Sequence, residues 1–125
     1  MALDAITTPT VVNPKTNGTL WAINGREADA STAIEIKATP GAGYSLHIEQ
    51  VYMSCPDADA FPHLQDEDDN VLFGPFYTTA TDPRIVDITF KHPIKMVSNK
   101  ALEIKAAAAG NIGLYIQGRT VKDGA

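Results

Sequence analysis

Residues 111–121 (NIGLYIQGRTV) decide the fold of this 125-residue chain. Apolar and polar side chains alternate along the stretch, with Ile112, Leu114 and Ile116 on one face and Tyr115, Gln117 and Arg119 on the other. A period of two is typical of a β-strand that has one face in a core and the other toward solvent. The stretch therefore predicts a strand, and the rest of the chain repeats its pattern.

Five further ranges have the character of strands: 32–38, 44–55, 71–77, 85–91 and 101–107. With residues 20–23 the total is seven to eight short strands separated by turns. The 3.6-residue period of an amphipathic helix is not apparent anywhere in the sequence. We expect an all-β fold, an antiparallel β-sandwich of jelly-roll-like type, and not an α/β enzyme.

Three local features refine this expectation. The apolar phase of residues 44–55 changes near Glu49 and Gln50, which predicts a β-bulge or bend. Gly74-Pro75 predicts an edge position or a bend, because proline cannot donate to a sheet ladder. Gly110-Asn111 has the composition of a hairpin turn.

The N-terminal segment has a different character from the rest of the chain. Prolines and glycines interrupt it, its threonines favour extended backbone, and neither periodicity is sustained. We expect residues 1–30 to form an extended arm and residues 31–125 the sandwich domain. Arm contacts with another subunit or a capsid are expected at Val11, Val12, Leu20 and Trp21. The alternative is that residues 20–23 form the first strand of the same domain.

The net charge of −5 is divided unevenly along the chain. Residues 38–83 carry eight carboxylates and neither Lys nor Arg, whereas residues 84–125 carry seven Lys and Arg against three carboxylates. Either the two blocks interleave within one fold and neutralise each other, or identical subunits dock acidic edge on basic edge.

Composition excludes several classes of protein. The single cysteine, Cys55, excludes an internal disulfide framework. No stretch approaches the ~20 apolar residues of a membrane span, and we expect neither a secretion signal nor a membrane partner. The acidic total argues against a nucleic-acid partner, which requires a basic face.

Candidate chemical motifs fail on inspection. Asp66, Asp68 and Asn70 match the first ligand positions of an EF-hand loop, but Val71 and Tyr77 occupy its glycine and glutamate positions. We expect a solvated hairpin tip there, with Asp69-Asn70 in the turn. Cys55 is expected to be a buried, inert thiol. His47, His63 and His92 lack zinc-ligand spacing. The sequence therefore predicts no catalytic, cofactor or metal site.

The body resembles the small β-sandwich virion proteins that decorate or cement the capsids of tailed bacteriophages. The likeness rests on residues 46–53 (LHIEQVYM), 66–77 (DEDDNVLFGPFY) and 100–118 (KALEIKAAAAGNIGLYIQG). The resemblance implies a jelly-roll-like domain, commonly trimeric, at a virion surface. It also implies an N-terminal extension that contacts the shell or a neighbouring subunit.

On this basis we expect a non-enzymatic structural protein that binds itself as a homotrimer and binds the major capsid protein. It would be located on the capsid surface of a virion assembled in the host cytoplasm. One alternative is a tail, neck or fibre component with the same fold. Another is a glycan-binding β-sandwich module, which requires clustered exposed aromatic side chains. The exposed aromatic candidates are Trp21, Tyr44, Tyr52, Tyr77 and Tyr115.

Overall fold

The computed structural model describes residues 4–7, 11–13, 18–57, 60–75 and 84–124, and these form ten strands and no helix. The strands are β1 (Asp4–Thr7), β2 (Val11–Asn13), β3 (Gly18–Glu27), β4 (Ile34–Lys37), β5 (Tyr44–Cys55), β6 (His63–Asp66), β7 (Val71–Phe73), β8 (Arg84–Lys95), β9 (Leu102–Lys105) and β10 (Ile112–Lys122). Every pairing between them is antiparallel. A helix with the length and hydropathy needed to cross a bilayer is absent from this described part of the chain.

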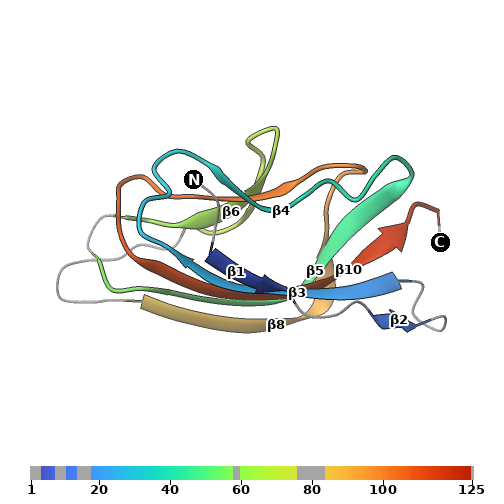
Figure 1. Ribbon diagram of the computed structural model, residues 1–125, viewed down its shortest axis with the longest axis horizontal. Coiled ribbons are helices and arrows are strands. Elements are labelled where there is room, and N and C mark those ends of the chain that lie inside the picture. The colour runs from blue at the N-terminus through green and yellow to red at the C-terminus, as the bar shows by residue number, and fades with distance from the viewer. Residues whose placement is uncertain (1–3, 8–10, 14–17, 58–59, 76–83, 125) are drawn as a thin grey trace.

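The eight strands from β3 to β10 follow the order of a jelly roll. The main sheet has the order β3-β10-β5-β8 and the second sheet β4-β9-β6-β7. If β3 is counted as strand 1, the main sheet has the order 1-8-3-6 and the second sheet the order 2-7-4-5. This is the double Greek key of a jelly roll. Figure 1 shows the main sheet as the lower layer, beneath β4 and β6. The predicted fold class is confirmed.

Alternation along the strands builds the core between the two sheets. The inner residues of β10, which are Ile112, Leu114 and Ile116, are at most 2% exposed. They belong to one apolar cluster with the inner residues of β5 and of the second sheet. The register of β5 against β8 shifts between Ile48 and Gln50, which confirms the predicted bulge. Because of that shift both Ile48 and Val51 face the core.

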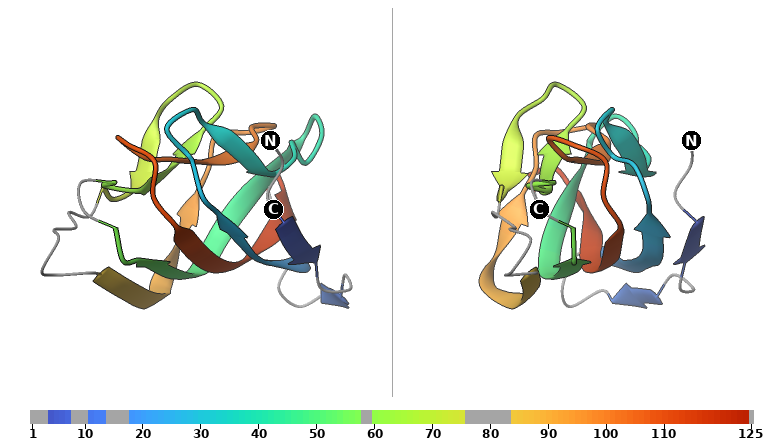
Figure 2. Two further views of the ribbon diagram at one scale, coloured as in Figure 1. Left: turned by 60° about the vertical axis from the view of Figure 1, so that its left-hand side comes forward. Right: turned by 90° about the vertical axis from the view of Figure 1, so that its left-hand side faces the viewer.

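The structure corrects the expected boundary of the arm. Residues 18–27 form β3, which pairs with β10 over its whole length, and Trp21 and Ile23 are buried in the core. The alternative reading of residues 20–23 as the first strand of the domain therefore holds. β1 and β2 pair in turn with the other edge of β3 (Figure 2, right). The described parts of residues 4–13 thus extend the main sheet of their own chain.

The pairing of the strands tests two expectations about the segments that connect them. The hairpin turn expected at Gly110-Asn111 is wrong, because β9 and β10 belong to different sheets. Residues 106–111 cross between the sheets, and backbone hydrogen bonds from Ala107 to Ala60 and from Gly110 to Ala28 hold the crossing. The edge position expected at Gly74-Pro75 is confirmed, since β7, which it follows, is the last strand of the second sheet.

A tryptophan–glycine contact fixes how closely the central strands approach. Gly118 of β10 pairs with Trp21 of β3, and a Cβ added at Gly118 would lie 2.6 Å from Cζ2 of the indole. The same Cβ would lie 2.2 Å from the backbone oxygen of His47 in β5. Position 118 therefore admits only glycine without a backbone shift. Lys37 Nζ also lies 5.6 Å from the centroid of the indole ring.

Replacing Gly118 by alanine is expected to lower the free energy of unfolding by about 1–3 kcal/mol, since the added methyl overpacks two strands. Urea denaturation followed by the fluorescence of Trp21 measures the loss. Gly113→Ala is the matched control on the same strand, because its Cβ meets only the rotatable hydroxyl of Ser54. Equal destabilisation by the two substitutions would contradict this account.

Deletion of residues 1–16 and deletion of residues 1–30 are expected to differ sharply in their effect on cooperative unfolding. The shorter deletion removes only β1 and β2 from one edge of the sheet. The longer one removes β3 with the buried Trp21 and Ile23, so it should abolish cooperative unfolding. Circular dichroism melting compares the two proteins. A folded chain lacking residues 1–30 would restore the arm boundary expected from sequence.

Candidate functional site

The face of the main sheet that points away from the second sheet is the broadest surface built from regular structure, and we call it the outer face. Its side chains are those that alternate with the core residues on β3, β10, β5 and β8. Paired residues on neighbouring antiparallel strands share a face, so the register groups these side chains into rungs across the sheet.

Four rungs cross the outer face in the order β3, β10, β5, β8. One of them is Arg26–Gly113–Ser54–Ile85, and the other three are numbered below as the first, second and third rungs. These three are Asn24–Tyr115–Tyr52–Asp87, Ala22–Gln117–Gln50–Thr89 and Leu20–Arg119–His47–Lys95. The third rung contains an ion pair, in which Arg119 Nε lies 2.9 Å from Glu49 Oε2. The first two rungs join aromatic rings and side-chain amides from strands far apart in the sequence.

The pKa of the His47 imidazole is lowered on this face, which favours its neutral form. Partial burial lowers its pKa, and the positive charge of Lys95 lowers it further, against the opposing carboxylates of Asp123 and Glu49. A neutral imidazole in a polar row is suited to hydrogen bonding rather than to binding an anion by charge.

Ser45, Asp123 and Ser98 form a polar contact beside His47. Both serine hydroxyls donate to the carboxylate of Asp123, and these hydrogen bonds lower its pKa. The contact ties the end of β10 to the start of β5 and to the loop before β9. A hydroxyl that donates to a carboxylate differs from the nucleophile–base pairing that activates a serine.

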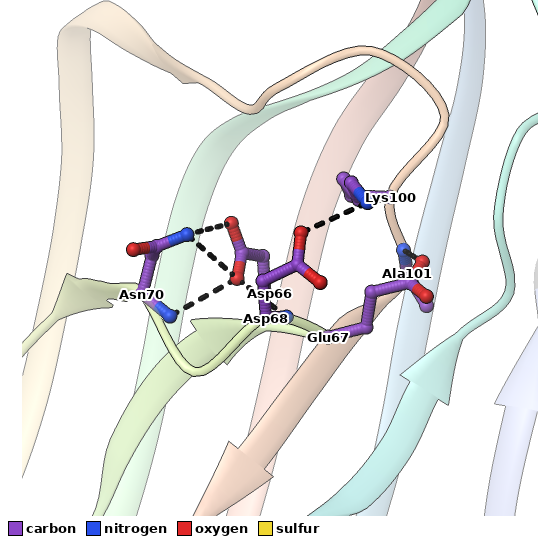
Figure 3. A network of polar contacts seen from close by, with 6 residues as sticks. All are labelled: Asp66, Glu67, Asp68, Asn70, Lys100 and Ala101. Atoms are coloured by element: carbon purple, nitrogen blue, oxygen red, sulfur yellow. Dashed lines mark hydrogen bonds and ion pairs between the residues drawn. The ribbon is translucent and has the colours of Figure 1, made fainter.

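The acidic loop between β6 and β7 is the expected hairpin tip, with residues 67–70 exposed, but Asp66 at its base is buried. Asp66 is 1% exposed, and its carboxylate accepts hydrogen bonds from the backbone of Asp68 and from the backbone and side chain of Asn70 (Figure 3). Asp69 lies in the turn as predicted, with a φ of 66°. Because N–H donors already occupy the Asp66 oxygens, they are not placed to ligate a cation. The described residues contain no cluster of His, Cys, Asp and Glu arranged for a metal.

The same loop joins the acidic and basic blocks of the sequence. Lys100 Nζ lies 2.8 Å from Asp68 Oδ2, and Glu67 accepts a 2.9 Å hydrogen bond from the backbone of Ala101 (Figure 3). Together with the contact between Glu49 and Arg119, these pairs show the two blocks interleaving within one chain. Docking of acidic edge on basic edge between subunits stays a prediction.

The structure separates the four residues expected to make arm contacts. Leu20 lies half-buried on the outer face, whereas Trp21 is 2% exposed and points into the core. Because its ring is buried, Trp21 exposes almost no surface that another subunit or a capsid could contact in this fold. Val11 and Val12 lie in β2, and their side chains are outside the described residues. Contacts of Val11, Val12 and Leu20 with another subunit stay predictions.

The expected burial of Cys55 is confirmed, and its thiol donates to the backbone oxygen of Asp57 at 3.7 Å. Of the aromatic candidates, Tyr44 is exposed at one end of β5, and Tyr77 lies outside the described residues. Tyr52 and Tyr115 are opposite each other on paired strands. Sequence alternation placed both on an exposed face, but only the register of β5 against β10 brings them together.

Comparisons with known proteins add little to this geometry. No family model and no curated protein matches the chain. A crystal structure of CapF with the inhibitor 3-isopropenyl-tropolone is 9% identical with a TM-score of 0.31, over 90% of this chain and 30% of that one. The capsular polysaccharide assembling protein CapF from Staphylococcus aureus is 11% identical with a TM-score of 0.28, over 90% and 31%. The chain covers less than a third of CapF, and a likeness of this degree carries no argument.

Replacing Asp66 by alanine is expected to lower the free energy of unfolding by about 1–3 kcal/mol at pH 7, because it removes the hydrogen bonds that the buried carboxylate accepts from Asp68 and Asn70. Burial favours a raised pKa for Asp66, but hydrogen bonds from Asn70 and Asp68 and the charge of Lys100 outweigh it and lower the pKa. The carboxylate therefore stabilises the fold fully above about pH 4, and this contribution is lost as the pH falls through the lowered value.

Urea denaturation at neutral and acidic pH measures this dependence. The gap in stability between the native protein and Asp66→Ala should narrow in acid. Asp68→Ala is the control, since it removes only an exposed ion pair worth up to about 1 kcal/mol. A gap that stays constant from pH 7 to acid, or equal losses in both variants, would contradict the assignment.

Proposed function

We propose that this protein is a non-enzymatic structural component of a tailed-bacteriophage virion, a decoration protein that binds and stabilises the major capsid lattice. The three stretches that resemble such proteins lie in β5, in the β6–β7 hairpin and in β9–β10. β5 and β10 are the neighbouring central strands of the main sheet, so the resemblance falls on the framework of the fold. The jelly-roll order agrees with the fold that the resemblance implies.

The observation that carries the proposal is the exposed apolar edge of β8. β8 pairs with β5 on one side, and no described strand pairs with its other side. Ile85 and Ile88 in its first half are 70% and 38% exposed. The opposite edge of the main sheet is covered by β1 and β2 (Figure 2, right).

The sequence of β8 divides this edge into two parts. The second half contains Lys91, Pro93 and Lys95, and proline and lysine are residues that keep sheet edges from pairing with other chains. The first half contains neither proline nor lysine, although it includes Arg84 and Asp87. Its exposed isoleucines lie on opposite faces of the sheet, Ile85 on the outer side and Ile88 on the core side. We assign this first half to contact with a neighbouring subunit in a homotrimer, the assembly that the resemblance implies.

Ile85→Lys is expected to weaken self-association without unfolding the subunit, because Ile85 is already exposed. Sedimentation velocity measures the assembly, and circular dichroism melting checks the fold. Val97→Lys is the matched control, since Val97 is 60% exposed in the loop after β8. A chain that is monomeric before substitution, or an assembly unaffected by Ile85→Lys, would contradict the assignment of this edge.

Imaging of intact virions tests the location. Gold-labelled antibodies against the chain should mark the whole head surface of phage particles from its source. Label confined to the tail, neck or fibres would replace the decoration role by the alternative virion role. Particles that carry no label would overturn both.

A further inference from the structure

The first two rungs of the outer face form a strip across the main sheet that is polar or aromatic except at the buried Ala22, and we call it the tyrosine–glutamine strip. It consists of the rungs Asn24–Tyr115–Tyr52–Asp87 and Ala22–Gln117–Gln50–Thr89. Four strands spaced about 4.8 Å apart give it a width of roughly 14 Å. Its aromatic centre is a pair of directly opposed tyrosines, and Tyr52 is 36% exposed.

The polar groups at the centre of the strip have no partners among the described residues. No hydrogen bond joins the side chains of Gln50, Gln117, Tyr52 or Tyr115 to that part of the chain. The second sheet provides the contrast. There, Gln65 donates to Glu103 at 2.9 Å and to Asp69 at 3.0 Å, and its oxygen contacts His63 at 2.8 Å. The side chain of Gln65 thus has hydrogen-bond partners within the second sheet, whereas those of Gln50 and Gln117 on the outer face have none among the described residues.

The charge of the strip limits what it can bind. Asp87 is its single ionisable group apart from the two phenols. Of the two neighbouring rungs, one holds Arg26, and the other holds Lys95 and the Arg119 that pairs with Glu49. A phosphate-rich polymer requires a row of cations, which the strip lacks. An extended peptide would use the unpaired backbone of a sheet edge rather than side chains on a paired face.

We propose that the tyrosine–glutamine strip is a binding site for a neutral oligosaccharide. Tyrosine rings offer apolar surface to the C–H face of a sugar, and the amides of Gln50 and Gln117 can both donate to and accept from its hydroxyls. Asn24 and Asp87, one at each end of the first rung, offer further hydrogen bonds. This inference goes beyond the virion role. Its tyrosines and glutamines lie on β5 and β10, while Asp87 and Thr89 at its end belong to the first half of β8, the segment assigned above to a subunit contact.

The full-length protein is tested on an array of neutral oligosaccharides of glucose, galactose, mannose and N-acetylglucosamine, with sulfated and sialylated glycans beside them. Binding should fall on neutral glycans and persist in 0.5 M NaCl, since charge contributes little. Tyr52→Ala and Tyr115→Ala should each weaken binding about three- to tenfold in calorimetric titration. Tyr52→Phe and Tyr115→Phe should retain most of it, because the ring remains.

Tyr44→Ala is the matched control, an exposed tyrosine on β5 outside the strip, and should bind as the native protein does. Circular dichroism melting verifies that each variant is folded. Binding confined to acidic glycans and abolished by salt would overturn the proposal. So would equal losses in Tyr44→Ala and Tyr115→Ala, or no binding to any neutral glycan at millimolar concentration. Loss of self-association in the strip variants would instead assign the strip to a subunit contact.

Discussion

The pairing of β10 between β3 and β5 is the interaction on which the rest of the structure depends. It joins the last strand of the chain to the first and third strands of the jelly roll, over nearly the full length of all three. The sandwich therefore closes only when the C-terminal strand is in place, and such contacts between distant segments are typical of slow-folding β-proteins. Close approach at the centre is possible because Gly118 leaves room for the indole of Trp21.

Among the residues that the structure describes, one face and one edge of the main sheet are covered by other strands, and the second face and the β8 edge are not. The inner face is filled by the core, and β1 and β2 extend the sheet beyond β3. What remains for partners is the first half of β8 and the outer face. A jelly roll by itself does not specify a function, since capsid subunits and lectins share it. The two proposals therefore rest on the exposed isoleucines of the edge and on the unpaired tyrosines and glutamines of the face.

The sequence predicts correctly the strands that are long and alternate apolar with polar side chains. It does not predict the features that depend on which strands lie beside one another. Residues 44–55 were predicted with their bulge because the phase change of the apolar residues is local. β6 was missed because His63–Asp66 contains one apolar residue, Leu64, and so shows no alternation, whereas β4 and β9, of the same length, contain two each. Trp21 was expected on an arm because the glycines and prolines around it hide its alternation with Ile23. The Gly110-Asn111 pair resembles a hairpin turn locally, although it leads the chain from one sheet to the other.

By itself, the sequence determined that this protein is an all-β sandwich and that Cys55 and the apolar face of each long strand are buried. These properties follow from a period of two and from the cost of exposing apolar surface, both of which are local. Only the tertiary structure decided that β3 belongs to the main sheet, that Asp66 is a buried turn carboxylate, and that Tyr52 and Tyr115 are opposite each other. Strand register and sheet order arise from contacts between distant segments, and the alternation of a single strand does not contain them.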